Sequence, residues 1–555
     1  MHSEERCAER SRSMKSNYEK DLRILNQIVP LFRLLLMIKN TFICLLLLLS
    51  TTLVSQNVMI SNQGSPNEPS IMMDPLHPNV IIGAANINKY YISLDTGRTW
   101  TNHSLQSSHG VWGDPTIAVD TNSDFYFFHL SNPPSGNWID RIVCQKTTDN
   151  GETWNDGSFT GLNGTKAQDK QWCAIDRTDN TIYLTWTQFD DYGSSAPTDS
   201  SIIYFSKSVD GGETWTTPLR LNKYAGDCID SDNTVEGAVP AVGPNGEVYV
   251  AWAGPNGIVF NKSLDKGITW LPKETPVDPM PTGWDYERPG INRANGLPVT
   301  ACDLSNGPDR GTIYINWSDQ RNGGNDTDIW LTKSTDGGQT WSGPIRVNDD
   351  GPGKQQFFTW MAIDQTTGYL FFVFYDRRFH SGDSTDVFLA LSTDGGNTFI
   401  NRKISETPFL PNSGIFFGDY TNITVNNGIV RPIWARLNEG QMSIWTHLTD
   451  QQEILTSTEA TASAIKELSF ENYPNPAQDV VYVSYNLRRK STINLMLINS
   501  KGNVVRKIIS NEKRGYGKYV EKIELNKLNT PSGVYLLQLE VDKQIITVKQ
   551  VIVRA

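Results

Sequence analysis

The strongest constraint on the fold is an eight-residue pattern that occurs six times between residues 93 and 399. Each copy fits S/T-x-D-x-G-x-T-W/F, and the third copy reads SVDGGETW at 208–215. In that copy, Asp210 is placed to accept hydrogen bonds from backbone N–H groups of the following turn. Gly212 allows the positive φ of such a turn, and Trp215 is expected to pack between neighbouring sheets. The pattern predicts six strand-connecting turns with structural aspartates, which are Asp95, Asp149, Asp210, Asp265, Asp336 and Asp394.

A second pattern alternates with these turns and predicts pairs of adjacent strands. An apolar segment, a turn and a second apolar segment recur seven times, and the last pair is followed by a third apolar segment at 442–448. Residues 57–61 precede the first pair just as 344–348 precede the sixth. We therefore expect 57–61 to complete the last sheet and close a ring, which removes a large exposed sheet edge. The sequence predicts an all-β propeller, with seven blades favoured over six.

These repeats resemble the Asp boxes (BNR repeats) of the sialidase superfamily, which join the third and fourth strands of propeller blades. The resemblance covers residues 56–449 and implies an Asp-box β-propeller in which the repeat aspartates are structural. It also implies a protein that acts on glycans or binds them. True sialidases have six blades, so the seven strand pairs are a departure from that family.

The tail predicts a separate domain. Residues 450–466 are polar and are expected to form a linker, and 467–555 show alternating apolar residues typical of a small antiparallel β-sandwich. The NYPNPA start, the N-x-x-G turn at 499–502, the SGVY segment and the final strand resemble the type A sorting domain of type IX secretion. The ending departs from that pattern, because Arg554 stands where lysine is usual. The alternative is an immunoglobulin-like carbohydrate-binding module.

The N-terminal region predicts export. Residues 37–55 read as a signal peptide, with a lysine-bearing start, an apolar run too short for a membrane span, and small residues at the end. Residues 1–36 are interpreted as a mis-called extension, the alternative being a long leader or an anchored one. The mature chain is expected to have no transmembrane segment and to be secreted or held at the outer cell surface. A formal charge of −11 argues against nucleic acid as a partner.

The mature chain keeps four cysteines, for which structural thiols or one or two disulfides are expected, with the pairing left open. Their spacing matches no metal motif. They are Cys144, Cys173, Cys228 and Cys302. No cofactor is predicted to be required, and the identity of any metal stays open. Ca²⁺ is an option because it prefers hard oxygen ligands such as carboxylates.

One face of the predicted ring carries the candidate chemistry. Loops that precede the first strand and follow the second strand of each blade meet there, around the central channel. Carboxylates recur at the first position, and arginines recur at the second in three consecutive blades. Crowded carboxylates raise one another's pKa, as acid–base catalysis requires, and arginine binds a substrate carboxylate through paired hydrogen bonds.

Site roles follow from the resemblance, because sialidases use an arginine triad, a tyrosine–glutamate nucleophile pair and an aspartate acid/base. The catalytic candidates are Asp114, Glu236, Tyr286 and Tyr420. The substrate-binding candidates are Arg321, Arg378, Arg436, Trp172, Trp360 and Asp419. The arginine motif near the N-terminus of sialidases is absent. An aspartate and an arginine two residues apart can also form a salt bridge between blades.

Two functions are consistent with these patterns. The first is a glycoside hydrolase, broadly an exo-α-sialidase-like enzyme, and the second is a noncatalytic surface propeller that binds glycans or proteins. In either case the predicted partners are a glycan or glycoprotein and the type IX secretion machinery. Tryptophans at loop ends could stack on sugar rings, although tryptophan is also common in propeller cores. Those tryptophans are Trp112, Trp138, Trp284 and Trp360.

Overall fold

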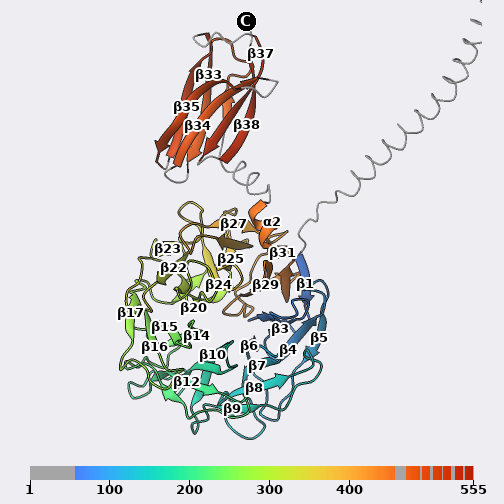
Figure 1. Ribbon diagram of the computed structural model, residues 1–555, viewed down its shortest axis with the longest axis vertical. Coiled ribbons are helices and arrows are strands. Elements are labelled where there is room, and N and C mark those ends of the chain that lie inside the picture. Colours follow the sequence, from blue (N-terminus) through green and yellow to red (C-terminus); the bar gives the residue numbers. More distant parts are fainter. Residues whose placement is uncertain are drawn as a thin grey trace, which may run out of the picture. The chain divides into compact units, whose positions relative to one another are not determined.

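The computed structural model describes residues 57–456, 471–487, 491–499, 504–515, 517–526, 532–541 and 544–553. The predicted signal peptide and the predicted N-terminal extension both lie outside these residues. The described chain is almost entirely β-structure, as predicted. It forms a ring of antiparallel sheets followed by a β-sandwich (Figure 1).

Seven antiparallel sheets follow one another through residues 57–450, which the structure describes without a gap. The first three contain β2 (Ser70–Met73), β3 (Ile81–Ala85), β4 (Lys89–Ser93), β5 (Thr101–Ser104); β6 (Gly113–Val119), β7 (Phe125–Leu130), β8 (Ile142–Thr147), β9 (Ser158–Thr160); and β10 (Ala167–Ile175), β11 (Ile182–Phe189), β12 (Ser201–Ser208), β13 (Leu219–Arg220). The next three contain β14 (Glu236–Val242), β15 (Val248–Ala253), β16 (Ile258–Ser263), β17 (Thr275–Asp278); β20 (Val299–Cys302), β21 (Ile313–Asp319), β22 (Asp328–Ser334), β23 (Ile345–Arg346); and β24 (Gln356–Asp364), β25 (Tyr369–Asp376), β26 (Asp386–Ser392), β27 (Ile400–Lys403). The seventh contains β28 (Asn422–Asn426), β29 (Ile429–Asn438) and β30 (Gln441–His447), with the short β31 (Thr449–Asp450) paired to β29.

The sheets form a closed ring. The first strand of each sheet contacts the first strands of the sheets before and after it, and β28 contacts β2. Second strands such as β7 and β25 are apolar over most of their length and buried, because each sheet packs against a neighbour on both faces. The alternation of strand pairs and turns in the sequence is therefore the repeat of one sheet after another around the ring.

Strand β1 (Asn57–Ser61) closes the ring. It pairs antiparallel with β30, with Asn57 opposite His447, so the blue first strand lies beside the last strands of the ring in Figure 1. The Asn57 side chain also donates to the Ile404 carbonyl, at 2.8 Å. The prediction that 57–61 complete the last sheet is confirmed.

The six repeat turns share one set of hydrogen bonds. In the third turn, Asp210 Oδ1 accepts from the Thr214 backbone N–H at 3.0 Å and from Ser208 Oγ at 2.7 Å. Gly212 has a φ of 81°, and a Cβ added there would lie 2.9 Å from Cys144 Sγ. Trp215 packs edge-on against Phe128 of the preceding sheet, with ring centroids 5.9 Å apart. The predicted turn geometry and the packing of this aromatic residue between sheets are both present.

A hairpin is inserted between the fourth and fifth sheets. It consists of β18 (Asp285–Arg288) and β19 (Ile291–Asn295). Ile291 and Ala294 join a core cluster that also contains residues of the sixth and seventh sheets. Arg377 Nη2 donates to the Pro289 carbonyl at 2.8 Å. The hairpin therefore packs against the sixth and seventh sheets, which do not adjoin it in the sequence.

The ring extends further than the predicted boundary at residue 449. Helix α2 (Gln451–Thr456) lies in what the sequence predicts as linker. Its Ile454 is 3% exposed and belongs to a core cluster of the ring, and the Ile454 carbonyl accepts from Arg402 at 3.1 Å. The segment is mostly polar in composition, but Ile454 is buried in the ring. The ring therefore ends further along the chain than the predicted linker boundary.

The tail forms the predicted sandwich. One sheet contains β32 (Glu471–Tyr473), β33 (Val480–Leu487) and β36 (Gly517–Glu524), and the other contains β35 (Val504–Arg514), β34 (Ser491–Asn499), β37 (Gly533–Val541) and β38 (Gln544–Val553). Val481 and Tyr485 of the first sheet share a core with Leu495 and Leu537 of the second. The predicted turn at 499–502 lies mostly outside the described residues.

Two further predictions concern the described residues. No helix among them is long and apolar enough to cross a membrane. The four cysteines at 144, 173, 228 and 302 are free thiols, of which three are buried. Burial raises the pKa of the Cys173 thiol above its usual range, so it stays protonated. These thiols agree with the structural role that was one of the two expectations.

Candidate functional site

The inner strands begin with a shared irregularity that places side chains at the axis. Four of them, β6, β10, β14 and β24, have a register shift within the first few residues. At these shifts Asp114, Lys170, Gly237 and Phe358 have φ values of 50°, 51°, 72° and 50°. A bulge of this kind redirects the side chains beside it. The bulges therefore place polar side chains at one end of the central channel. In a regular strand, successive side chains would point alternately to opposite faces of the sheet.

Lys170 lies at the centre of a group of charged and titratable side chains that we call the axial cluster. Its members are Glu68, Asp114, Asp169, Lys170, Asp230, Glu236, Arg293 and Asp419. Its ammonium nitrogen lies 2.6 Å from Asp419 Oδ2, 3.4 Å from Asp114 Oδ2 and 3.9 Å from Glu68 Oε1. The Lys170 side chain is 7% exposed. Burial lowers its pKa, but the surrounding carboxylates raise the Lys170 pKa well above its usual range, so it stays charged.

Arg293 supplies the second cation of the axial cluster from the inserted hairpin. Its guanidinium binds Asp419 through two nitrogens and lies 2.7 Å from Asp230 Oδ2. Asn295, two residues further, donates to the Asp419 backbone carbonyl at 2.9 Å. The hairpin therefore fixes Asp419, which belongs to the opposite part of the ring. Burial opposes ionisation, but Lys170 and Arg293 hold the pKa of Asp419 far below its usual value.

For other carboxyl groups of the cluster the pKa is shifted in the opposite direction. Burial, with the nearby Asp114 charge, raises the pKa of Glu68 well above its usual value, and the same two causes raise the pKa of Asp169. Burial also raises the pKa of Glu236, followed by the charge of Asp230. For Asp114 burial is opposed by Lys170 and by hydrogen bonds from Glu68 and Asp169, which together lower its pKa. Protonated and ionised carboxyl groups thus lie side by side.

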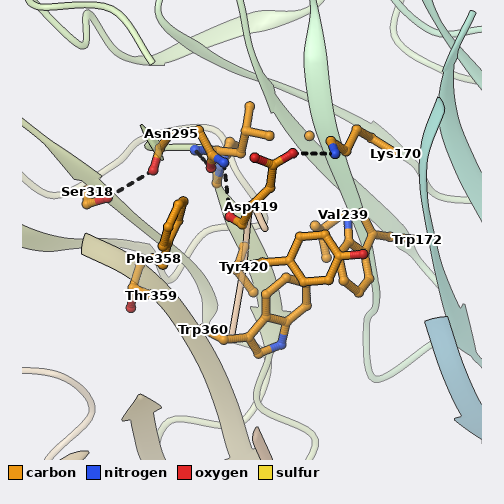
Figure 2. Close-up of a pocket in the computed structure, with 14 residues that line it drawn as sticks. Lys170, Trp172, Val239, Asn295, Ser318, Phe358, Thr359, Trp360, Asp419 and Tyr420 are labelled. Atoms are coloured by element: carbon orange, nitrogen blue, oxygen red, sulfur yellow. Dashed lines mark hydrogen bonds and ion pairs between the residues drawn. The ribbon is translucent and has the colours of Figure 1, made fainter. Parts of the chain in front are cut away.

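A small aromatic pocket, with an enclosed volume of about 30 Å³, lies beside the cluster. Figure 2 shows Asp419 pointing toward Lys170, with Trp172, Trp360 and Tyr420 gathered beneath them. The Trp172 and Trp360 rings lie 4.2 Å apart, and Tyr420 meets Trp172 edge-on at 5.1 Å. The pocket offers an apolar surface with a carboxylate and an ammonium at its edge, a composition that suits a sugar ring.

Six of the ten predicted site residues lie in the cluster or in this pocket. Asp114 and Glu236 belong to the cluster, Trp172, Trp360 and Tyr420 line the pocket, and Asp419 belongs to both. The Tyr420 hydroxyl points to Asp114 Oδ1 at 3.5 Å. Burial raises the pKa of Tyr420 well above its usual range, so its hydroxyl stays protonated. Their roles in binding or catalysis stay predictions.

The three predicted arginines do not line the pocket. Arg321 pairs with Asp319 and, at 2.7 Å, with Asp278 of the preceding sheet. Arg378 pairs with Asp376 at 2.7 Å and with Asp349. Arg436 donates to the Thr407 carbonyl at 3.2 Å, and Trp445 flanks its guanidinium. Each arginine binds its own sheet to the sheet or loop that precedes it, which agrees with the salt-bridge alternative. The contacts give no support to a carboxylate-binding triad.

Tyr286 does not line the pocket, but its hydroxyl contacts two residues that do. Its hydroxyl lies 2.9 Å from the Asn295 carbonyl and 2.6 Å from Ser318 Oγ, and its ring stacks under Arg288 at 4.5 Å. Tyr286 is 6% exposed and belongs to the core cluster that holds the hairpin. These contacts describe a residue that anchors β18, and they give no support to a nucleophilic role.

Five members of the cluster were not among the predicted site residues. Glu68, Asp169 and Lys170 lie near the start of a first strand, the position at which carboxylates recur. The other two are Arg293, which lies in β19 of the inserted hairpin, and Asp230, which lies in the long segment between β13 and β14. Neither position recurs from sheet to sheet, so the repeat alignment gives no signal for either. The unusual length of both connections was the available signal, because long loops on a rigid scaffold commonly carry function.

No group of three or more histidine, cysteine, aspartate or glutamate side chains suited to a metal ion occurs among the described residues. The carboxyl groups at the axis converge instead on Lys170 and Arg293. Ca²⁺ as a ligand of this protein therefore stays a prediction from the sequence.

Comparison with known protein families identifies the tail. Residues 471–554 match the family described as secretion system C-terminal sorting domain. The tail is a secretion sorting domain. The predicted export by type IX secretion, to the cell surface or the medium, is confirmed by this match. A comparison with curated protein sequences found no match.

Solved structures similar to the chain include glycan-active proteins of low sequence identity. An ulvan lyase is 14% identical, with 71% of this chain and 96% of the lyase covered and a TM-score of 0.42. An α-L-arabinofuranosidase of Fusarium graminearum is 12% identical, with 72% and 99% covered and a TM-score of 0.41. The Trypanosoma rangeli sialidase is 11% identical, with 89% of each chain covered and a TM-score of 0.38.

Proposed function

We propose that this exported protein binds the end of a neutral glycan in the axial pocket and hydrolyses its glycosidic bond with the carboxyl groups around Lys170. One observation carries the proposal: carboxyl groups in opposite protonation states share one buried ammonium beside an aromatic pocket. Glycoside hydrolysis requires a carboxylic acid that protonates the leaving oxygen and a carboxylate that acts on the other side of the bond. The axial cluster supplies both forms at one pH.

Glu68 is the proposed proton donor. It is 2% exposed, and burial, with the nearby Asp114 charge, raises its pKa well above its usual value, which favours the protonated form that a proton donor needs. Asp114 and Asp419 have lowered pKa values and stay ionised, so either carboxylate is in the form that attacks carbon or activates water. Lys170 positions these groups and keeps the carboxylates charged.

The charge of the site favours a neutral sugar over a sialic acid. The axial cluster holds six carboxyl groups and two cations, and both cations are already paired with carboxylates. A substrate carboxylate would meet like charge there. The three arginines that were predicted to bind such a carboxylate are occupied by contacts within the ring.

A second function is favoured by one observation. Asp419, the carboxylate that lines the pocket, is held by Lys170 and Arg293 together. Because both oxygens of this carboxylate are already paired with cations, the group is suited to binding a glycan without reacting with it. The alternative is therefore a secreted propeller that binds glycans in the same pocket without cleaving them.

The test is a screen of chromogenic aryl glycosides of neutral sugars and of sialic acid. We expect turnover of at least one neutral glycoside by the wild type. Glu68→Gln should lower kcat by about 100-fold to 10,000-fold, because the amide cannot donate a carboxylic acid proton. Asp210→Asn, in a repeat turn, is the matched control and should leave kcat unchanged.

Two results would overturn the hydrolytic proposal. One is retention of kcat by Glu68→Gln, and the other is the absence of turnover across the panel. If the panel is inert but neutral glycans bind on a glycan array, recognition without cleavage is the function. Turnover confined to sialosides would contradict the argument from charge.

A further inference from the structure

We infer that Trp112 and Trp138 form a second glycan subsite, which holds the continuation of an oligosaccharide whose end lies in the axial pocket. This inference rests on the proposed glycan ligand, and it adds where the rest of that ligand binds. Trp112 is 40% exposed and Trp138 is 44% exposed. All 16 tryptophans lie in the described ring, and these two are the ones that present large exposed surfaces.

The two rings form a corner on the face where the axial cluster opens. Their centroids lie 6.2 Å apart with an interplanar angle of 87°. Trp112 lies two residues before Asp114, and Trp138 lies in the connection from the second to the third strand of the same sheet. Such a corner exposes the face of one ring beside the edge of the other, which suits the C–H-rich face of a pyranose.

A chain of contacts joins this corner to the axial cluster. Trp138 meets Tyr192 edge-on at 5.6 Å, and the Tyr192 hydroxyl donates to Asp230 Oδ2 at 2.7 Å. Asp230 in turn binds Arg293 at 2.7 Å. The aromatic surface is therefore continuous with the polar groups at the axis, so a bound chain would pass from one to the other over Tyr192.

The loop that carries Trp138 is held rigidly by polar contacts. Asp140 accepts hydrogen bonds from Ser131 Oγ at 2.9 Å and from the Arg141 side chain at 2.7 Å. The Ile139 backbone N–H donates to the Ser131 carbonyl at 3.0 Å, and Ile139 is 1% exposed. These contacts hold the backbone beside Trp138, which reduces the entropy cost of ordering the loop when a ligand binds.

The other two tryptophans considered for stacking lack this exposure. Trp284 is 3% exposed and donates its indole N–H to the Thr234 carbonyl at 3.1 Å. Trp360 packs against Trp172 inside the pocket. A neutral oligosaccharide is the occupant that fits both ends of the path, because aromatic rings bind its apolar faces and the carboxyl groups accept its hydroxyl protons.

The experiment measures binding of the secreted full-length protein to an array of neutral oligosaccharides of one to six residues, with sialylated and sulfated glycans as a second class. We expect affinity to rise with chain length for at least one neutral series. Trp138→Ala and Trp112→Ala should each weaken binding of the longest member by about tenfold and leave the monosaccharide unaffected. Tyr224→Ala removes a side chain that is 51% exposed elsewhere on the ring and is the matched control.

The subsite is disproved if both tryptophan variants bind every chain length as the wild type does, or if no neutral glycan binds. Because each ring is about half exposed, both variants should fold, which circular dichroism checks. Glu68→Gln separates the two proposals, since it should abolish turnover and keep the dependence of affinity on chain length. If the protein cleaves no glycoside but binds longer glycans more tightly, the proposed hydrolysis is overturned and the subsite is supported.

Discussion

The aspartates of the repeat turns and two glutamates of the axial cluster, Glu68 and Glu236, belong to the same ring but have pKa values shifted in opposite directions. Asp210 and Asp265 accept hydrogen bonds from a threonine and from backbone N–H groups, and their pKa falls to about 2. Glu68 and Glu236 are 2% and 1% exposed, and burial raises their pKa well above the usual range. One set is stabilised as anions, and the other is kept protonated.

The difference follows from what surrounds each carboxyl group. A turn aspartate stays near solvent while the following backbone supplies donors, which favours the charged form. Neither carboxylate oxygen of Glu236 accepts a hydrogen bond from a donor in the described part of the chain, and the carboxyl lies beside that of Asp230. Repetition in the sequence marks both sets, because the turn aspartates recur in an eight-residue pattern and Glu68, Asp114, Glu236 and Asp419 all lie at or just before the start of a first strand.

The largest expected effect is the loss of the central ammonium. Lys170→Met removes the cation shared by Asp419, Asp114 and Glu68, so we expect the free energy of unfolding to fall by about 3–5 kcal/mol. Urea unfolding followed by tryptophan fluorescence measures this, because all 16 tryptophans lie in the ring. Lys166→Met, which removes a partly exposed pair with Asp190, should cost less than about 1 kcal/mol. If both variants lose the same free energy of unfolding, the axial ion pairs stabilise the fold no more than a partly exposed pair does.

A second prediction concerns the pH dependence of stability. Because the folded-state pKa of Glu236 is raised, the unfolded chain loses this proton above about pH 4 while the folded chain keeps it. Glu236 therefore makes stability fall as pH rises from there toward its folded pKa. Glu236→Gln should remove this decline, a change of slope of up to about 1.4 kcal/mol per pH unit. An unchanged slope between pH 5 and pH 7 would show that Glu236 is ionised in the folded protein.

A third prediction tests the geometry of a repeat turn. Gly212→Ala places a Cβ at a φ of 81°, where it would lie 2.9 Å from Cys144 Sγ. We expect a loss of about 1–2 kcal/mol from the backbone conformation alone. Gly343→Ala, which adds a Cβ in open space, serves as the control. Equal melting temperatures of the two variants would argue that the turn relaxes at no cost.

The smallest effect is expected for the charge of one turn aspartate. The lowered pKa of Asp210 means that its contribution is present above about pH 4 and is lost as pH falls toward 2. Asp210→Asn should lower stability at pH 7 by about 1 kcal/mol and have little effect at pH 2.5. A variant that is equally destabilised at both pH values would assign the effect to packing. This is the opposite sign of pH dependence to that predicted for Glu236.

The ring and its closure were predictable because each sheet repeats the same local chemistry. The six turn aspartates, the strand pairs and the pairing of 57–61 with the last sheet all follow from self-similarity. Six of the ten predicted site residues also meet, since residues at one offset of a repeat reach the same face. Arg293 and Asp230 come from segments without repeats, and the contacts of Arg321, Arg378 and Arg436 within the ring depend on packing that no single repeat reveals.

The axial site is tested most directly by a crystal structure with the neutral oligosaccharide that binds best on the array. We predict a sugar ring in the pocket beside Trp172, Trp360 and Asp419, with the following residues of the glycan on Trp112 and Trp138. A glycan bound on the face of the repeat turns, or at the sandwich of the tail, would contradict the assignment of the axial cluster as the functional site.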